Sequence, residues 1–140
     1  MSTEIRPEVS KKKPYYVEKH RYYELKHFCL QWKTWKRYLN DFEIRYPKID
    51  TSGIPKDHNS AESNPTAEEV ERRDRYASLC RMVQNAANDA DEFLAGYILL
   101  GVTHGCTYEI LRTSNNIHCC RERYYFAYRK FFWLLDKARK

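Results

Sequence analysis

Apolar and aromatic residues recur three and four positions apart along much of this chain of 140 residues, and this spacing is the strongest constraint on its fold. The clearest stripe lies in residues 118–140 and consists of Tyr124, Tyr128, Phe131, Leu135 and Ala138. Side chains at these intervals share one face of an α-helix. We find no strand-like alternation, and the chain has only 4 Gly and 5 Pro, which disfavours a turn-rich β fold. We predict an all-α fold.

A second stripe predicts a long amphipathic helix over residues 14–46. Its apolar positions are Tyr22, Leu25, Cys29, Trp32, Leu39 and Phe42. A helix of this length exceeds what a small domain needs, so it either breaks or reaches a second subunit. A homo-oligomer formed through residues 15–46 is therefore one expected partnership.

The rest of the chain divides by composition. Residues 1–13 are short, charged and end in a lysine run, which predicts a disordered basic tail. Residues 47–65 hold three prolines and many small polar residues, which predicts a linker or a long loop between packed helices. Residues 66–140 are predicted to form a helical bundle that contains a helix-turn-helix.

Helix boundaries in this bundle are predicted from capping residues. Asn64 is a candidate cap with Pro65 in the first turn, and Asn88–Asp89 offers an end. Three further helices are then expected, one with Phe93 on its packed face, one capped by Cys106 or Thr107, and one beginning near His118.

Charge is unevenly distributed along the chain. The formal net charge is +6, but residues 118–140 alone carry seven Lys/Arg against two Asp/Glu. Residues 1–50 are also basic, with twelve against seven, whereas residues 51–117 are acidic, with six against ten. Basic ends around an acidic middle favour a polyanionic partner over charge that merely confers solubility.

Catalytic, metal and membrane motifs are not found in the sequence. The 5 Cys are odd in number and contain no CxxC pair, so we expect reduced thiols, no metal site and no cofactor. We find no phosphate loop or nucleophile motif and expect no enzymatic activity. No apolar run reaches the ~20 residues of a membrane span and no signal peptide is evident, so we expect a cytoplasmic protein without a membrane partner.

A short helix, a polar turn and a long basic helix form the outline of a helix-turn-helix. Its second helix would enter the major groove of double-stranded DNA. Arg121, Tyr125 and Arg129 share one predicted outward face, and Arg123 lies beside them. Lys130 is placed to contact phosphates, and Thr107 and Tyr108 could hold a phosphate at the start of the shorter helix.

The C-terminal part resembles small Gram-positive phage regulators of the ArpU/RinA type. The matching segments are "TYEIL", "NNIHC" and "YRKFFWLLDKAR". The resemblance covers about the last 50 to 70 residues and implies a helix-turn-helix similar to region four of sigma factors. It implies recognition-helix residues Cys120, Arg121, Arg123, Tyr124 and Arg129, although Tyr124 also belongs to the predicted core stripe.

The expected function is a sequence-specific DNA-binding regulator of a phage or prophage in a host bacterial cell, with RNA polymerase as a possible further partner. The alternative is a small phage or mobile-element protein that binds a host protein through its aromatic N-terminal helix, as an inhibitor or as a packaging or assembly adaptor. Opposite charges at Arg121 and Arg123 would separate the two hypotheses.

Overall fold

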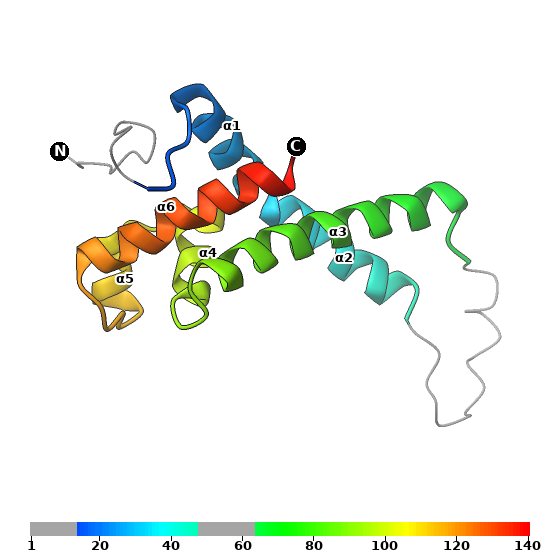
Figure 1. Cartoon of the computed structure of the whole chain (residues 1–140). Helices are drawn as coiled ribbons and strands as arrows, with labels where there is room; N and C mark the ends of the chain where they lie inside the picture. The colour runs from blue at the N-terminus through cyan, green and yellow to red at the C-terminus, as the bar shows by residue number, and fades with distance from the viewer. Residues whose placement is uncertain (1–13, 48–63) are drawn as a thin grey trace. The chain divides into compact units, whose positions relative to one another are not determined.

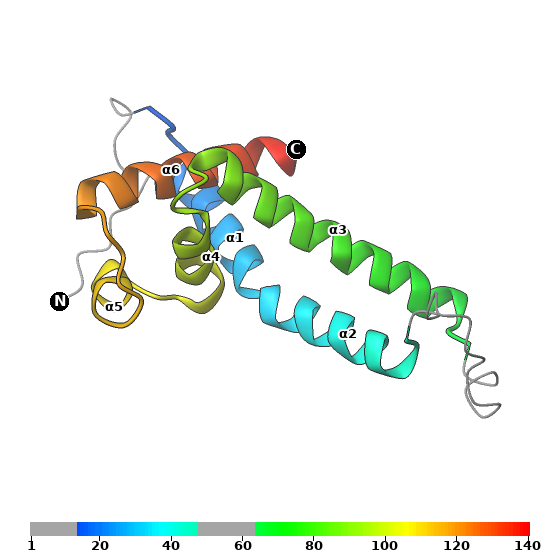
Figure 2. The same cartoon turned by 90° about the horizontal axis from the view of Figure 1, so that it is seen from below.

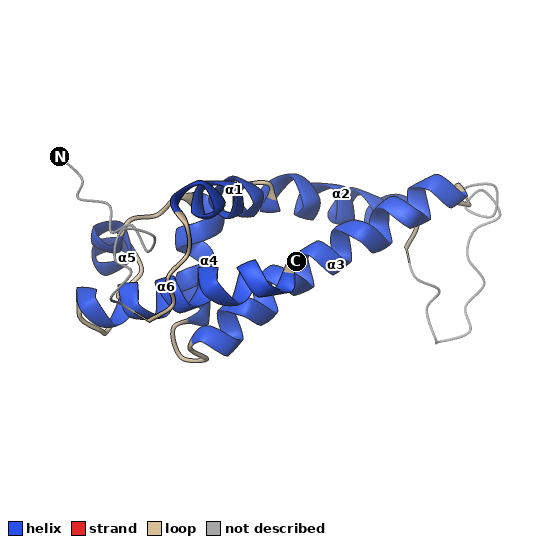
Figure 3. Ribbon diagram, turned by 45° about the horizontal axis from the view of Figure 1, so that its top comes forward, coloured by secondary structure: helices blue, strands red, loops and turns tan. Residues whose placement is uncertain are grey.

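The structure, a computed structural model, describes residues 14–47 and 64–140. The predicted tail at 1–13 and nearly all of the predicted linker at 47–65 lie outside the described residues. The helices are α1 (Lys19–Leu30), α2 (Trp32–Arg45), α3 (Ala67–Ala90), α4 (Ala95–His104), α5 (Tyr108–Ser114) and α6 (Arg121–Ala138) (Figure 1). The described ranges contain no strand, which confirms the all-α prediction (Figure 3). None of their helices is long and apolar enough to cross a membrane.

The chain forms two compact units. We call the first the main unit, whose described residues are 14–32 and 81–140, and the second the hairpin unit, whose described residues are 33–47 and 64–80. This division differs from the predicted separation of 14–46 from 66–140, because α1 belongs to the same unit as α4, α5 and α6. The physical reason is that the apolar side chains of α1 are buried in the core of that unit.

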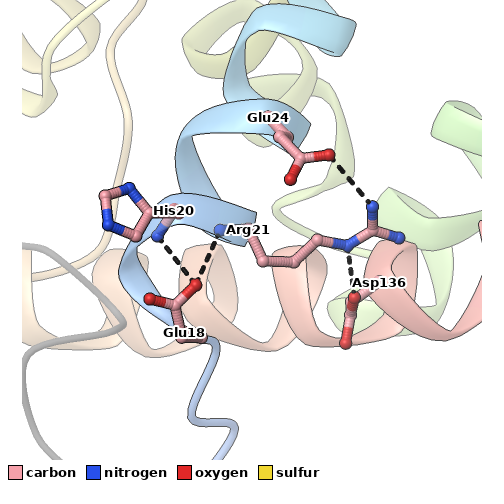
Figure 4. A network of polar contacts seen from close by, with 5 residues as sticks. All are labelled: Glu18, His20, Arg21, Glu24 and Asp136. Carbon is pink, nitrogen blue, oxygen red and sulfur yellow. Dashed lines mark hydrogen bonds and ion pairs between the residues drawn. The ribbon is translucent and has the colours of Figure 1, made fainter.

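The long helix predicted over 14–46 is broken, which was one of the two alternatives for its length. Gln31 ends α1, and its backbone N–H donates to the carbonyl of Phe28 at 3.1 Å. At the other end of α1, Glu18 caps the helix by accepting from the backbone N–H groups of His20 at 3.0 Å and Arg21 at 3.1 Å (Figure 4). These hydrogen bonds to the charged carboxylate lower the pKa of Glu18.

In the hairpin unit, α2 and the first half of α3 run antiparallel. Tyr38 contacts Tyr76 edge to face at a centroid distance of 5.3 Å, and the guanidinium of Arg73 lies 5.0 Å from the ring of Phe42. Nearer the open end, the Tyr46 hydroxyl donates to Glu69 at 3.1 Å. Contacts of aromatic rings with one another and with guanidinium groups thus join the two helices of this unit.

Helix α3 begins two residues later than Asn64 and Pro65 predicted. The hydroxyl of Thr66 accepts from the backbone N–H of Glu69 at 3.1 Å, and the Glu69 carboxylate accepts from the N–H of Thr66 at 3.3 Å. This reciprocal arrangement is a capping box, which satisfies two backbone donors and replaces the cap predicted at Asn64. At its other end α3 continues past Asn88–Asp89 to Ala90, so that predicted boundary was also too early.

The core of the main unit lies between α1, α4 and α6, which contact one another (Figure 2). Rings dominate it: Tyr22 of α1 packs edge to face on Phe132 at 5.0 Å, and the hydroxyls of Tyr22 and Tyr128 share a hydrogen bond of 3.1 Å. The fully buried side chains include Tyr22, Leu25, Ile98, Leu111, Tyr124, Phe131, Phe132 and Leu135. Each edge-to-face ring pair adds about 0.5–1.5 kcal/mol beyond its buried area.

Two glycines of α4 shape this core. Gly105 ends the helix with φ +70° and ψ +22°, a left-handed conformation that glycine adopts without a Cβ clash. Gly101 lies against the Tyr124 hydroxyl, and a Cβ at this position would collide with that oxygen. The Tyr124 hydroxyl is buried and finds no hydrogen-bond partner among residues 14–47 and 64–140.

The turn before α4 corrects the prediction for Phe93. Asp91 caps this turn by accepting from the backbone N–H groups of Phe93 at 2.9 Å and Leu94 at 3.2 Å. Because the helix begins only at Ala95, Phe93 lies in the turn and is 78% exposed, whereas Leu94 is buried.

Candidate nucleic-acid interface

The first turn of α6 lies beside the start of α5. Thr107 caps α5 by accepting from the backbone N–H of Ile110 at 3.3 Å, as one of the two predicted caps. Cys120 occupies the capping position of α6, where its side chain makes no capping hydrogen bond. Helix α4 packs against both α5 and α6 and so fixes the position of this helix pair.

A groove of about 580 Å³ opens between α5 and α6. Its lining residues are Tyr108, Glu109, Arg112, Thr113, Cys120 and Arg121. The structure therefore brings three predicted site residues together, namely Tyr108, Cys120 and Arg121. Sequence reasoning missed the other three, although their spacing from Tyr108 on a short helix places them on the same side.

Tyr108 has a structural role within this groove. Its hydroxyl donates to the backbone carbonyl of Cys119 at 2.5 Å, and its ring lies 5.9 Å from that of Tyr124. The phenol therefore ties the start of α5 to the residue before the α6 cap, which limits the predicted role of Tyr108 in holding a phosphate.

Arg121 and Arg123, two of the predicted site residues, are partly exposed to solvent, and each forms an ion pair. Arg121 donates to Glu109 at 3.2 Å and lies 5.6 Å from the ring of Tyr125, with 39% of its side chain exposed. Arg123 donates to Asp91 at 3.3 Å with 57% of its side chain exposed. Exposed pairs of this kind contribute only about 0.2–1 kcal/mol, so a phosphate can compete for either guanidinium at low cost.

The predicted outward face of residues 121, 125 and 129 is wrong at two of its three positions. Tyr125 and Arg129 are buried, each with 8% exposure. Helix α1 packs on this side of α6, where Tyr22 meets Phe132 and Arg21 donates to Asp136 at 2.6 Å (Figure 4). Residues at 125, 129, 132 and 136 share one helical face, so Tyr125 and Arg129 lie on the same side of α6 as these contacts with α1.

Arg129 is an unusual core residue, since it pairs with no carboxylate among the described residues. Burial disfavours its charged form and lowers its pKa. Tyr124, which the family resemblance implied as a recognition residue, is also buried, and burial raises its pKa. Neither side chain can reach a nucleic-acid groove in this structure.

The exposed face of α6 is instead a line of alternating rings and cations: Phe126, Lys130, Trp133 and Lys137. Phe126 is 45% exposed, and Lys130 and Trp133 are half-buried. The ammonium of Lys137 lies 3.3 Å from the centroid of the Trp133 ring. Of these residues only Lys130 belongs to the predicted site. These residues follow one another at intervals of four, three and four positions, which places them on one face of the helix. The buried stripe has the same intervals, so spacing alone could not show which of the two faces is exposed.

The five cysteines are free thiols. Cys29 and Cys80 are buried, and burial raises the pKa of both. Cys120 is exposed, and within residues 14–47 and 64–140 no three His, Cys, Asp or Glu side chains are grouped to hold a metal ion.

Comparison with protein-family models, with curated proteins and with solved structures finds no match to this chain.

Proposed function

We propose that this protein is a DNA-binding regulator that contacts duplex DNA through the start of α6 and the groove beside α5. The observation that carries the proposal is the position of Arg121 and Arg123. Both lie in the first turn of a helix whose remaining length is anchored in the core, and both side chains reach solvent.

The shape of the helix pair supports this assignment. A recognition helix must be held firmly by its inner face while its first turns project from the protein. The rings of Tyr128, Phe131 and Phe132 anchor α6, and the first turn is less covered. The open capping position at Cys120 leaves backbone N–H groups that can donate to a phosphate oxygen.

Charge gives further support. Arg112 is exposed on the groove wall next to Arg121, so three guanidinium groups flank the junction of α5 and α6. Glu109 and Asp91 neutralise part of this charge in the free protein. Approaching phosphates would displace these carboxylates from the two arginines. Where a nucleic acid does not place its phosphates correctly, the carboxylates would stay in position and repel it.

The alternative proposal is a small phage or mobile-element protein that binds a host protein through residues 15–46. Tyr22, Phe28 and Trp35 of this stretch are buried within the chain, whereas Leu30 is 42% and Ile44 71% exposed. These two exposed side chains are the candidate contacts for a host protein or for a homo-oligomer. RNA polymerase as a partner remains a proposal, for which exposed Phe93 is a candidate contact.

Selection from random duplex DNA, followed by gel shift, tests the proposal. We expect enrichment of a defined sequence by the full chain and loss of its binding in the Arg121→Glu/Arg123→Glu variant. Circular dichroism must show an unchanged helix content and melting transition, because both side chains are exposed.

A matched control is Lys19→Glu/Lys26→Glu, which makes the same charge change on α1. If this control weakens binding as much as the α6 variant does, binding depends on net charge alone and the proposed interface is wrong.

A further inference from the structure

A second surface of α6 lies apart from the groove and carries rings as well as cations. We call it the aromatic-basic stripe: Tyr15, Phe126, Lys130, Trp133 and Lys137. Tyr15 precedes α1 and packs on two rings of α6, at 5.5 Å from Phe126 and 5.1 Å from Trp133. The part on α6 runs over twelve residues, from Phe126 to Lys137, and the helix rises about 16 Å between them.

The cations of the stripe are close to its rings. The Lys137 ammonium lies 3.3 Å from the Trp133 centroid, and the Lys130 ammonium lies 5.8 Å from the Tyr15 centroid. Neither lysine forms an ion pair with a carboxylate of the described residues. The one nearby acidic residue of this half of α6, Asp136, already accepts from Arg21 at 2.6 Å. Within the described residues, neither lysine of the stripe is therefore neutralised by an ion pair.

We infer that the aromatic-basic stripe binds single-stranded nucleic acid. Cations attract the phosphate backbone, and exposed rings stack on bases that are not paired. Phe126 offers the most exposed ring, and Tyr15 extends that apolar surface. A duplex hides its base faces within the helix, so it would use the lysines of the stripe and leave the rings without a role. An acidic peptide would likewise satisfy only the cations.

The inference does not depend on duplex recognition, because the two surfaces use different residues. Arg121 and Arg123 lie at the first turn and pair with Glu109 and Asp91, whereas the stripe occupies residues 126–137 of the same helix. A protein that binds DNA whose strands have separated locally would need both surfaces, one for the remaining duplex and one for a single strand.

The test measures binding of the full chain to a fluorescein-labelled 15-nucleotide oligo-dT by anisotropy. We expect Phe126→Ala to weaken binding about tenfold, as expected for loss of one stacked base. Phe93→Ala is the matched control, since it removes a ring that is even more exposed but lies off the stripe, and it should leave affinity unchanged. Equal effects of the two substitutions, or no binding of oligo-dT at low salt, would overturn the inference.

The cations are tested separately by Lys130→Gln/Lys137→Gln. Both substitutions are at or near the surface, and we expect the slope of log affinity against log salt to become shallower by about 1.4. Lys19→Gln/Lys26→Gln on α1 should leave the slope unchanged. A poly-glutamate competitor that displaces oligo-dT at equal charge concentration would show that the rings contribute nothing, and would also overturn the inference.

Trp133 provides an internal reporter. Oligo-dT should quench tryptophan fluorescence in the wild-type chain, and Trp133→Phe should remove most of the quench with little loss of affinity. If the quench survives this substitution, it arises from Trp32 or Trp35 and the site lies elsewhere. The Arg121→Glu/Arg123→Glu variant should retain oligo-dT binding, so failure of the duplex proposal and failure of this one give different results.

Discussion

The two faces of α6 are built from the same kinds of residue and have opposite environments. Its inner face holds rings and one cation, with Phe131 and Tyr124 fully buried and Arg129 almost so. Its outer face also holds rings and cations, with Phe126 and Lys137 exposed. Residue type therefore does not decide which face is buried. The decisive factor is which elements pack on the helix, and here α1 and α4 select one face.

The largest contrast should come from removing one ring from each face. Phe131→Ala should lower the free energy of unfolding by about 3–5 kcal/mol, because it opens a cavity in the ring cluster. Phe126→Ala should cost less than about 1 kcal/mol, since its ring is 45% exposed. Urea unfolding followed by circular dichroism measures both, and similar losses would contradict the assignment of faces.

Gly101 tests how tightly the inner face is packed. Gly101→Ala should lower the free energy of unfolding by about 1–3 kcal/mol, because its new Cβ meets the Tyr124 hydroxyl. Tyr124→Phe removes that hydroxyl, which has no partner, and should be nearly neutral alone.

The double variant is the decisive arm of that experiment. In Gly101→Ala/Tyr124→Phe most of the loss should be recovered, which gives a coupling of at least about 1 kcal/mol in a double-mutant cycle. Additive effects would mean that Gly101 and the Tyr124 hydroxyl do not touch.

Ion pairs at the two ends of α6 should differ by a smaller amount. Asp136→Asn breaks a half-buried pair with Arg21 at 2.6 Å and should lower the free energy of unfolding by about 1 kcal/mol. Glu109→Gln breaks the exposed pair with Arg121 and should change it by less than about 0.5 kcal/mol. Thermal unfolding at low and high salt compares them, and a larger effect at Glu109 would reverse the proposed order.

The smallest effect is expected at Arg129. Its guanidinium is buried without a carboxylate from the described residues, so Arg129→Met should raise the free energy of unfolding by about 0.5 kcal/mol. Urea unfolding provides the measurement. If Arg129→Met instead lowered the free energy of unfolding by more than about 1 kcal/mol, Arg129 would make a contact that stabilises the fold.

Local sequence signals predicted the helices and one face of α6, but not how the helices pack. The spacing correctly predicted the burial of Tyr124, Tyr128, Phe131 and Leu135, whereas Ala138, the fifth member of the predicted stripe, is exposed at the end of α6. The core stripe left Arg129 on the predicted outward face, yet α1 packs on that side of α6, where Tyr22 contacts Phe132. No local pattern encodes such a distant contact.

Capping residues predicted the start of α5 but not the start of α3. Thr107 was correctly identified as a candidate, because Ile110 lies at the right spacing to donate to it. Asn64 was predicted as the cap of α3, although Thr66 and Glu69 have the capping-box spacing in the sequence. The candidate site was predicted only in part. Arg121 and Arg123 could be placed at the start of a helix from the sequence, whereas the exposure of Phe126 and Trp133 depends on tertiary packing.

The most direct test of a two-faced α6 is the salt dependence of duplex binding at the selected site. With neutral replacements, Arg121→Gln/Arg123→Gln should make the slope of log affinity against log salt shallower by about 1.8, because two phosphate contacts are lost. Arg129→Met removes a cation from the same helix and should leave the slope unchanged. A slope altered by Arg129→Met, or unaltered by the paired first-turn substitutions, would contradict the account.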